Sequence, residues 1–133
     1  MVNLDVREAN GLVLAYLGDS VWELSIRTYF INKGYNIKNL NRLVKEHVNA
    51  QAQSKYLKNI IDDLDEDKLT LVNRSKNSNI KTFPKSCSVM EYKEATAFEA
   101  LIGALYVEGK MEEINKYSRK KLRLRSDSKW DSN

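Results

Sequence analysis

Residues Leu12 to Arg27 read LVLAYLGDSVWELSIR, and this stretch decides the fold. It is apolar, rich in small side chains and free of proline, as expected of a helix that packs into a core. Asn10 stands before it as a candidate N-cap, and Gly34 is suited to end the helix. We therefore predict a helix from Leu12 to about Lys33, with one acid, Asp19, among core-like residues.

A second stretch of the same character spans Glu94 to Gly109 and reads EATAFEALIGALYVEG. Its many alanines and Gly103 allow another helix backbone to approach closely. Glu99 lies among them, as Asp19 does in the first stretch. Acidic side chains are rarely fully buried unless they are paired or bind a metal. If the two helices pack side by side, Asp19 and Glu99 share one site.

The sequence as a whole predicts an all-α chain that forms a single domain over residues 1–133. The chain has one proline and is 42% hydrophobic, which is enough for one core. Residues from about 125 to 133 have the character of a frayed tail. Further helices are predicted over Leu40 to about Tyr56, Ser54 to Leu64, Lys68 to Asn73, Glu91 to about Val107, and Met111 to about Leu124.

Several classes of protein are disfavoured by the composition. Cys87 is the single cysteine, so an intrachain disulfide is excluded and a reducing cytoplasm is expected. The N-terminus lacks the pattern of a secretory signal, and no apolar run approaches the roughly 20 residues that span a bilayer. The formal net charge of +4 favours an anionic partner.

The positive charge gathers in two acid-free clusters. We predict a long basic loop over about residues 73–90 and take its four cations as candidate nucleic-acid-binding residues, although a loop kept basic for solubility is the alternative. These four are Arg74, Lys76, Lys81 and Lys85. For the C-terminal cluster, contact with a nucleic acid and solubility are equally supported. That cluster comprises Lys116, Arg119, Lys120, Lys121, Arg123 and Arg125.

Two neighbouring carboxylates point to metal chemistry. They repel each other, and a proton or a divalent cation relieves the repulsion. Oxygen ligands without a His or Cys grouping favour Mg²⁺, and Mg²⁺ with an anionic partner suggests phosphodiester hydrolysis. The alternative is that Asp19, which follows a glycine, is only a kink or cap residue. Glu23 and Arg27 are read as an i, i+4 ion pair.

The sequence resembles the ribonuclease III family at two motifs. Leu17 to Val21 (LGDSV), followed by Trp22-Glu23-Leu24, is similar to the family's first acidic motif, and Phe98 to Tyr106 (FEALIGALY) is similar to the second. Finer details resemble its Mini-III subfamily. These are Leu14-Ala15-Tyr16, Val48-Asn49-Ala50-Gln51-Ala52-Gln53 and Arg74-Ser75-Lys76-Asn77.

The resemblance implies a helical ribonuclease III endonuclease domain without a double-stranded-RNA-binding domain. It implies a homodimer that cuts double-stranded RNA with Mg²⁺, for which Mn²⁺ can substitute. Asp19 and Glu99 match the family's catalytic metal ligands. The implied substrate is the stem that joins the ends of the 23S ribosomal RNA precursor. Whether a ribosomal protein helps to present this substrate is left open by the sequence.

This sequence departs from full-length ribonuclease III at two positions. Ala15 and Thr96 stand where that enzyme has further acids, and Mini-III shares this loss. Because fewer ligands remain, the sequence does not decide between one and two metal ions per site. Glu23 is read as structural rather than as an outer-shell group. His47 is expected to be a surface or groove residue rather than a general base. Core or dimer-interface positions are expected for Trp22, Tyr16, Tyr29 and Tyr106.

Two rival functions remain at this point. The first is a non-catalytic module that uses the same fold to bind structured RNA. Such a module would bind phosphate better without Asp19 and Glu99, so the presence of both acids argues against it. The second is a helical protein-interaction scaffold, which leaves the paired acids and the basic loop unexplained.

Overall fold

The structure is a computed structural model, and it describes residues 3–78, 82 and 84–126. Every regular element in these ranges is helical, as predicted. The elements are α1 (Gly11–Asn32), α2 (Ile37–Val48), α3 (Ala50–Ile60), the short 3₁₀ helix η1 (Ile61–Asp63), α4 (Glu66–Lys76), α5 (Val89–Val107) and α6 (Met111–Ser126).

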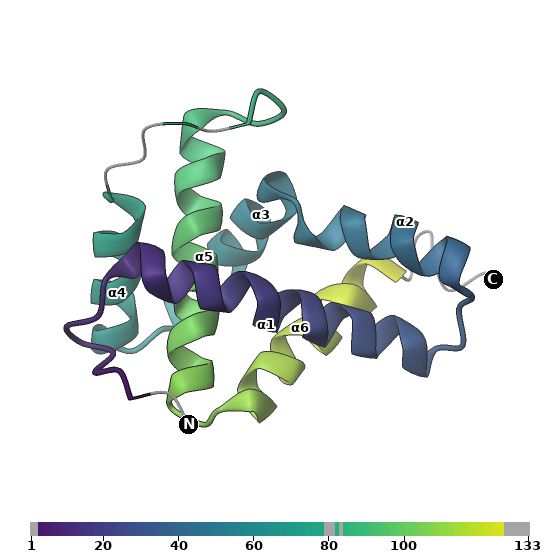
Figure 1. The fold of residues 1–133 in the computed structure, drawn as a ribbon, viewed down its shortest axis with the longest axis horizontal. Helices are drawn as coiled ribbons and strands as arrows, with labels where there is room; N and C mark the ends of the chain where they lie inside the picture. Colours follow the sequence, from purple (N-terminus) through teal and green to yellow (C-terminus); the bar gives the residue numbers. More distant parts are fainter. Residues whose placement is uncertain (1–2, 79–81, 83, 127–133) are drawn as a thin grey trace.

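The arrangement is built on the crossing of α1 and α5, the two longest helices. α3 and α4 pack against α5, while α2 and α6 pack against α1 (Figure 1). The N-terminal half of α1 thus lies across α5, and its C-terminal half runs between α2 and α6. None of the helices in the described ranges has the length and apolar character needed to cross a bilayer.

The main core is an aromatic cluster at this crossing. Trp22 of α1 meets Phe98 of α5 edge-on with ring centroids 4.9 Å apart, and Tyr56 of α3 completes the cluster. The indole Nε1 of Trp22 donates to the backbone oxygen of His47 at 3.2 Å. Trp22 is therefore a core residue of the single chain rather than part of an exposed interface.

His47 is not the surface or groove residue that the sequence predicted. Its side chain is fully buried, and its Nδ1 forms a hydrogen bond with the hydroxyl of Tyr56. Its helix, α2, has a strong apolar face that covers α1, and His47 lies on that face. His47 follows Leu43 and Val44 at helical spacing, so the apolar face of the helix indicated its burial, and the misassignment arose because histidine was taken as a polar residue.

The prediction of one helix from Leu40 to Tyr56 was wrong, because the chain breaks at Asn49. Asn49 has an extended backbone, with ψ at 163°, between α2 and α3. Its side-chain oxygen accepts from the backbone nitrogen of Ala52, and its amide nitrogen donates to the backbone oxygens of Lys45 and Glu46. One asparagine therefore ends α2 and caps α3, in keeping with the preference of asparagine for helix ends.

The segment predicted as a loop over residues 73–90 is shorter than expected. α4 continues to Lys76, so Arg74 and Lys76 are helical. At the other end α5 already begins at Val89, where Ser88 and Glu91 form a reciprocal capping box. The spacing of Ser88 and Glu91 was visible in the sequence and would have placed this boundary correctly.

Candidate active site

The two acid-bearing helices touch at glycines. A Cβ atom on Gly18 would lie 1.8 Å from the backbone oxygen of Glu99, and one on Gly103 would lie 2.1 Å from the backbone oxygen of Leu14. A larger side chain at either position would overlap the opposite main chain. The α1 and α5 backbones are thus in direct contact, as their small residues predicted. Asp19, which follows Gly18, comes to lie beside Glu99.

A hydrogen bond joins the carboxyl groups of Asp19 and Glu99. Burial, followed by this hydrogen bond and the negative charge of Asp19, raises the pKa of Glu99 from its ordinary 4.5 to about 9. At neutral pH Glu99 therefore keeps its proton and donates it to Asp19. Asp19 is the exposed member of the pair and Glu99 the half-buried one.

The pair lies in a pocket of about 380 Å³ between α1, α3 and α5. Its walls are mostly small or apolar, so polar groups are few. Apart from the two acids, the lining consists of Leu12, Ala15, Tyr16, Val48, Ala50, Gln53, Pro84, Tyr92, Ala95 and Thr96.

Ala15 and Thr96, the two departures from full-length ribonuclease III, both lie in this lining. Thr96 uses its hydroxyl to donate to the backbone oxygen of Tyr92 at 2.9 Å, so the hydroxyl supports its own helix. The pocket therefore lacks a carboxylate at both positions, and among the described residues that line it only Asp19 and Glu99 are acids.

Gln53 is a polar residue of this pocket that the sequence did not single out. It comes from α3, is 2% exposed, and its amide lowers the pKa of Glu99 against the stronger effects above. Its Nε2 nevertheless reaches no hydrogen-bonding geometry with any partner in the described part of the chain. The stretch VNAQAQ marked the region as family-like, but nothing in it showed which glutamine points inward.

The donor set suits a divalent cation that keeps most of its water. Within the described ranges, no three His, Cys, Asp or Glu side chains gather as a metal cluster. The pocket instead offers the carboxylates of Asp19 and Glu99, and Mg²⁺ is commonly held by one or two carboxylates together with several waters. A cation would replace the proton that the two acids share. The residues present therefore fit Mg²⁺.

The predicted RNA-binding cations differ in their surroundings. The guanidinium of Arg74 donates to the backbone oxygens of Val6 and Ala9, at 3.0 and 2.7 Å, and so fastens the turn before α1. Lys76 ends α4 half-buried, and Lys85 is exposed directly after Pro84 of the pocket lining. Lys81 lies outside the described residues.

Other predicted side chains are found where the sequence placed them. Glu23 pairs with Arg27 at 2.6 Å, as an i, i+4 ion pair on α1. Cys87 is half-buried, and its Sγ lies 3.8 Å from the backbone oxygen of Pro84. Tyr16, by contrast, is 86% exposed, which excludes a core position within one chain.

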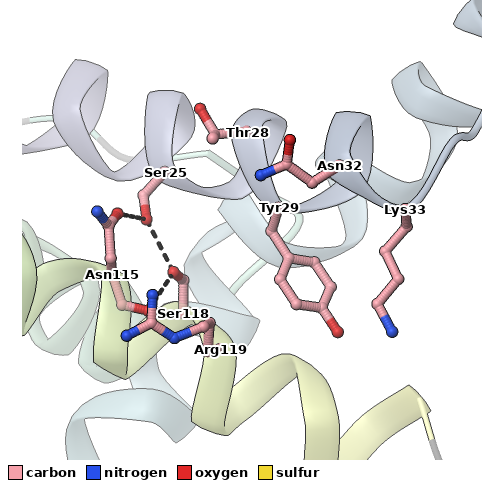
Figure 2. A pocket seen from close by; sticks show the side chains of 8 residues that line it. All are labelled: Ser25, Thr28, Tyr29, Asn32, Lys33, Asn115, Ser118 and Arg119. Carbon is pink, nitrogen blue, oxygen red and sulfur yellow. Dashed lines mark hydrogen bonds between the residues drawn. The ribbon is translucent and has the colours of Figure 1, made fainter.

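A second large pocket, of about 330 Å³, lies between α1 and α6 (Figure 2). Its buried hydroxyls are satisfied within the wall, since Ser25 bonds to both Asn115 and Ser118. Arg119, from the C-terminal basic cluster, and Lys33 line it, but no acid does. It therefore has no counterpart of the carboxylate pair. The side chains of Lys121, Arg123 and Arg125 lie outside the described part.

Comparison with known proteins gives the family. The Ribonuclease III domain matches residues 12–110, a span that holds both acids and both crossing glycines. A Mini-ribonuclease 3-like protein of Ilyobacter polytropus is 60% identical over 87% of this chain and 91% of its own length. A Mini-ribonuclease 3 of Desulfitobacterium hafniense is 43% identical, over 81% and 69% respectively.

A solved structure agrees with these matches. The crystal structure of a Fusobacterium nucleatum protein superposes with a TM-score of 0.84 at 53% identity, and the match covers 92% of this chain and 99% of that one. The matches in sequence and in fold thus indicate the same family as the two acidic motifs did. The chain belongs to the ribonuclease III family, in its Mini-III branch.

Proposed function

We propose that this protein is an endoribonuclease of the Mini-III type that hydrolyses double-stranded RNA, with Mg²⁺ held by Asp19 and Glu99. The observation that carries the proposal is the placement of these two carboxyl groups side by side in one pocket, which a main-chain crossing holds in place. The family match supplies the reaction class, because the matched domain is that of a ribonuclease.

Each acid has a defined part in this mechanism. Glu99 would hold the cation as a carboxylate from the half-buried side of the pocket, and Asp19 would provide the second carboxylate from the solvent side. A divalent cation, when bound, stabilises the charge that builds on the phosphate and lowers the pKa of water. The contact of α1 with α5 holds both carboxylates in place beforehand, so little reorganisation is needed during the reaction.

RNA binding is assigned to the basic residues near the pocket. Double-stranded RNA is recognised mainly through its phosphates and 2′-hydroxyls. Lys85 is supported most directly, because it is exposed and adjoins the pocket lining at Pro84. Lys76 extends the proposed surface, and Lys81, which lies outside the described residues, stays a proposed RNA-binding residue on its charge alone, whereas Arg74 contributes mainly by holding the turn before α1.

The proposal includes a homodimer. Leu12, Val13 and Tyr16 expose apolar surface on α1 next to Asp19, and exposed apolar surface of this kind commonly marks a protein interface. A twofold axis beside Asp19 would present two equal sites to the two antiparallel strands of a duplex. The proposed substrate in the cell is the stem of the 23S ribosomal RNA precursor, in the cytoplasm.

The deciding experiment is incubation of a plain RNA duplex with the protein, in Mg²⁺ and in chelator, read on a denaturing gel. We expect Mg²⁺-dependent cuts in both strands. Asp19→Asn and Glu99→Gln should each reduce cleavage by at least about a hundredfold while duplex binding persists, since both remove a carboxylate and leave the basic residues.

Glu23→Gln is the matched control, because Glu23 is an acid one turn further along α1 that pairs with Arg27 and does not line the pocket. It should cut at the normal rate. Near-normal cleavage by Asp19→Asn would refute the assignment. Binding of the duplex without cleavage in either condition would favour the non-catalytic RNA-binding module.

A further inference from the structure

Gln53 carries a buried hydrogen-bond donor without an acceptor. The residue is 2% exposed, and its Nε2 has no hydrogen-bond partner among the described residues. Buried side-chain donors in proteins are nearly always satisfied, and each exception calls for a reason. Leaving one unsatisfied costs stability, so its presence in this pocket indicates that the hydrogen bond forms when the pocket binds something.

The position of Gln53 shows which group that partner can be. Gln53 lines the same pocket as Asp19 and Glu99, and it enters from α3, the third helix around the pocket. α3 packs against α5, the helix that bears Glu99 (Figure 1). The amide of Gln53 is close enough to the Glu99 carboxyl to lower its pKa, but its Nε2 does not reach hydrogen-bonding geometry with that carboxyl.

We propose that Gln53 is a positioning residue, whose Nε2 donates to the Glu99 carboxylate when that carboxylate holds a divalent cation. The inference rests on the proposed function. The Glu99 carboxylate would then be the acceptor that the buried Nε2 lacks in the metal-free protein. Gln53 would then restrain Glu99 from the α3 side, while the cation restrains it from the side of Asp19.

A neutral donor suits this place better than a charged residue. Another acid would repel Glu99, and a lysine would compete with the cation for the carboxylate. The pocket has Ala15 and Thr96 where other family members have acids, so each remaining ligand bears more of the binding. Outer partners that orient ligands commonly change metal affinity by about 10–100-fold.

The test is Gln53→Met, which keeps the length of the side chain but removes the donor. We expect Mn²⁺ binding without RNA, followed by the electron paramagnetic resonance signal of free Mn²⁺, to weaken by about 10–100-fold. The melting temperature in chelator should stay the same or rise, because an unsatisfied buried donor is lost. A merely structural role would instead lower the melting temperature.

Gln51→Met is the matched control. Gln51 is an exposed glutamine of the same helix that donates to the backbone oxygen of Ser86, outside the pocket lining, and its variant should bind Mn²⁺ normally. Wild-type Mn²⁺ affinity in Gln53→Met, or a lowered melting temperature, would overturn the inference alone. Failure of the wild-type protein to bind Mn²⁺ would overturn both the inference and the proposed function.

Discussion

The side chain of Glu99 is protonated in the folded, metal-free chain. Its pKa of about 9 keeps it protonated at neutral pH, and its proton lies in the hydrogen bond to Asp19. The two acids are unequal, because Asp19 is exposed and Glu99 half-buried. A cation would therefore meet Asp19 first and displace the proton of Glu99 afterwards.

This protonation makes the stability of the metal-free protein depend on pH. Between pH 4.5 and about 9, Glu99 holds a proton in the folded chain but not in the unfolded chain. The unfolded state then binds fewer protons, so the free energy of unfolding falls as pH rises through this window. Glu99→Gln is neutral at every pH, and we expect its unfolding free energy to decline less.

Thermal melts in chelator at pH 6 and pH 8 measure this effect. The melting temperature of the wild-type protein should fall more from pH 6 to pH 8 than that of Glu99→Gln. An equal loss in both proteins would show that Glu99 is ionised in the folded chain.

At the scale of elements, the crossing of α1 and α5 sets the distance between the acids. Gly18→Ala would place a methyl group against the backbone oxygen of Glu99, so the helices must separate. Overpacking of this kind costs about 1–3 kcal/mol, and we expect that loss in denaturant unfolding. Cleavage per folded molecule should fall at least about tenfold, since misplacement of catalytic groups by about 1 Å can cost a hundredfold.

Gly34→Ala is a control variant that should lower the stability of the fold without changing the crossing of α1 and α5. Gly34 has φ at +86° in the turn after α1, and a Cβ there would meet no atom within 4 Å. Alanine in this left-handed conformation costs about 1–2 kcal/mol, but the change lies far along α1 from Asp19. Its cleavage rate per folded molecule should stay normal. Normal cleavage by Gly18→Ala as well would disconnect the crossing from the site.

The helices themselves were largely predictable, and their ends were less so. α1 and α5 came directly from long apolar runs with small residues, and both lie within two residues of the expected limits. The break at Asn49 was missed because apolar periodicity continues across it, whereas the break depends on three hydrogen bonds of one side chain. α4 was predicted too short because its last turn is polar.

At the scale of the whole molecule, the basic residues divide into those that can meet RNA and those that hold the fold. Lys76→Ala and Lys85→Ala should each reduce the slope of log binding constant against log salt by about 0.9 per lost phosphate contact. Their melting temperatures should not change. Filter binding of duplex RNA across a salt series gives the slopes.

Arg74→Ala should behave differently from Lys76→Ala. Loss of the Arg74 guanidinium leaves the backbone oxygens of Val6 and Ala9 without their donor, which costs about 1–3 kcal/mol. The free energy of unfolding of Arg74→Ala should therefore fall, while the salt dependence of its RNA binding should change little. An unchanged slope in both lysine variants would remove this face from the RNA interface.

The candidate site was half visible in the sequence. Asp19 and Glu99 stood out because acids are unusual within apolar helical runs. Gln53 did not, since glutamine is mostly a surface residue, and only the packing of α3 turns it inward. The role of Arg74 depends on the turn before α1, which is distant in the chain, so composition alone assigned it to the basic loop.

The meeting of Gly18 and Gly103 has a consequence for how such a protein can diversify. The spacing of the two acids is set by main chain against main chain, so it does not depend on the identity of the other residues around them. Other positions of the pocket lining, such as Ala50, can therefore change during evolution, or by design, without moving the two acids apart. The acid pair would be inherited unaltered while the rest of the pocket changes its shape.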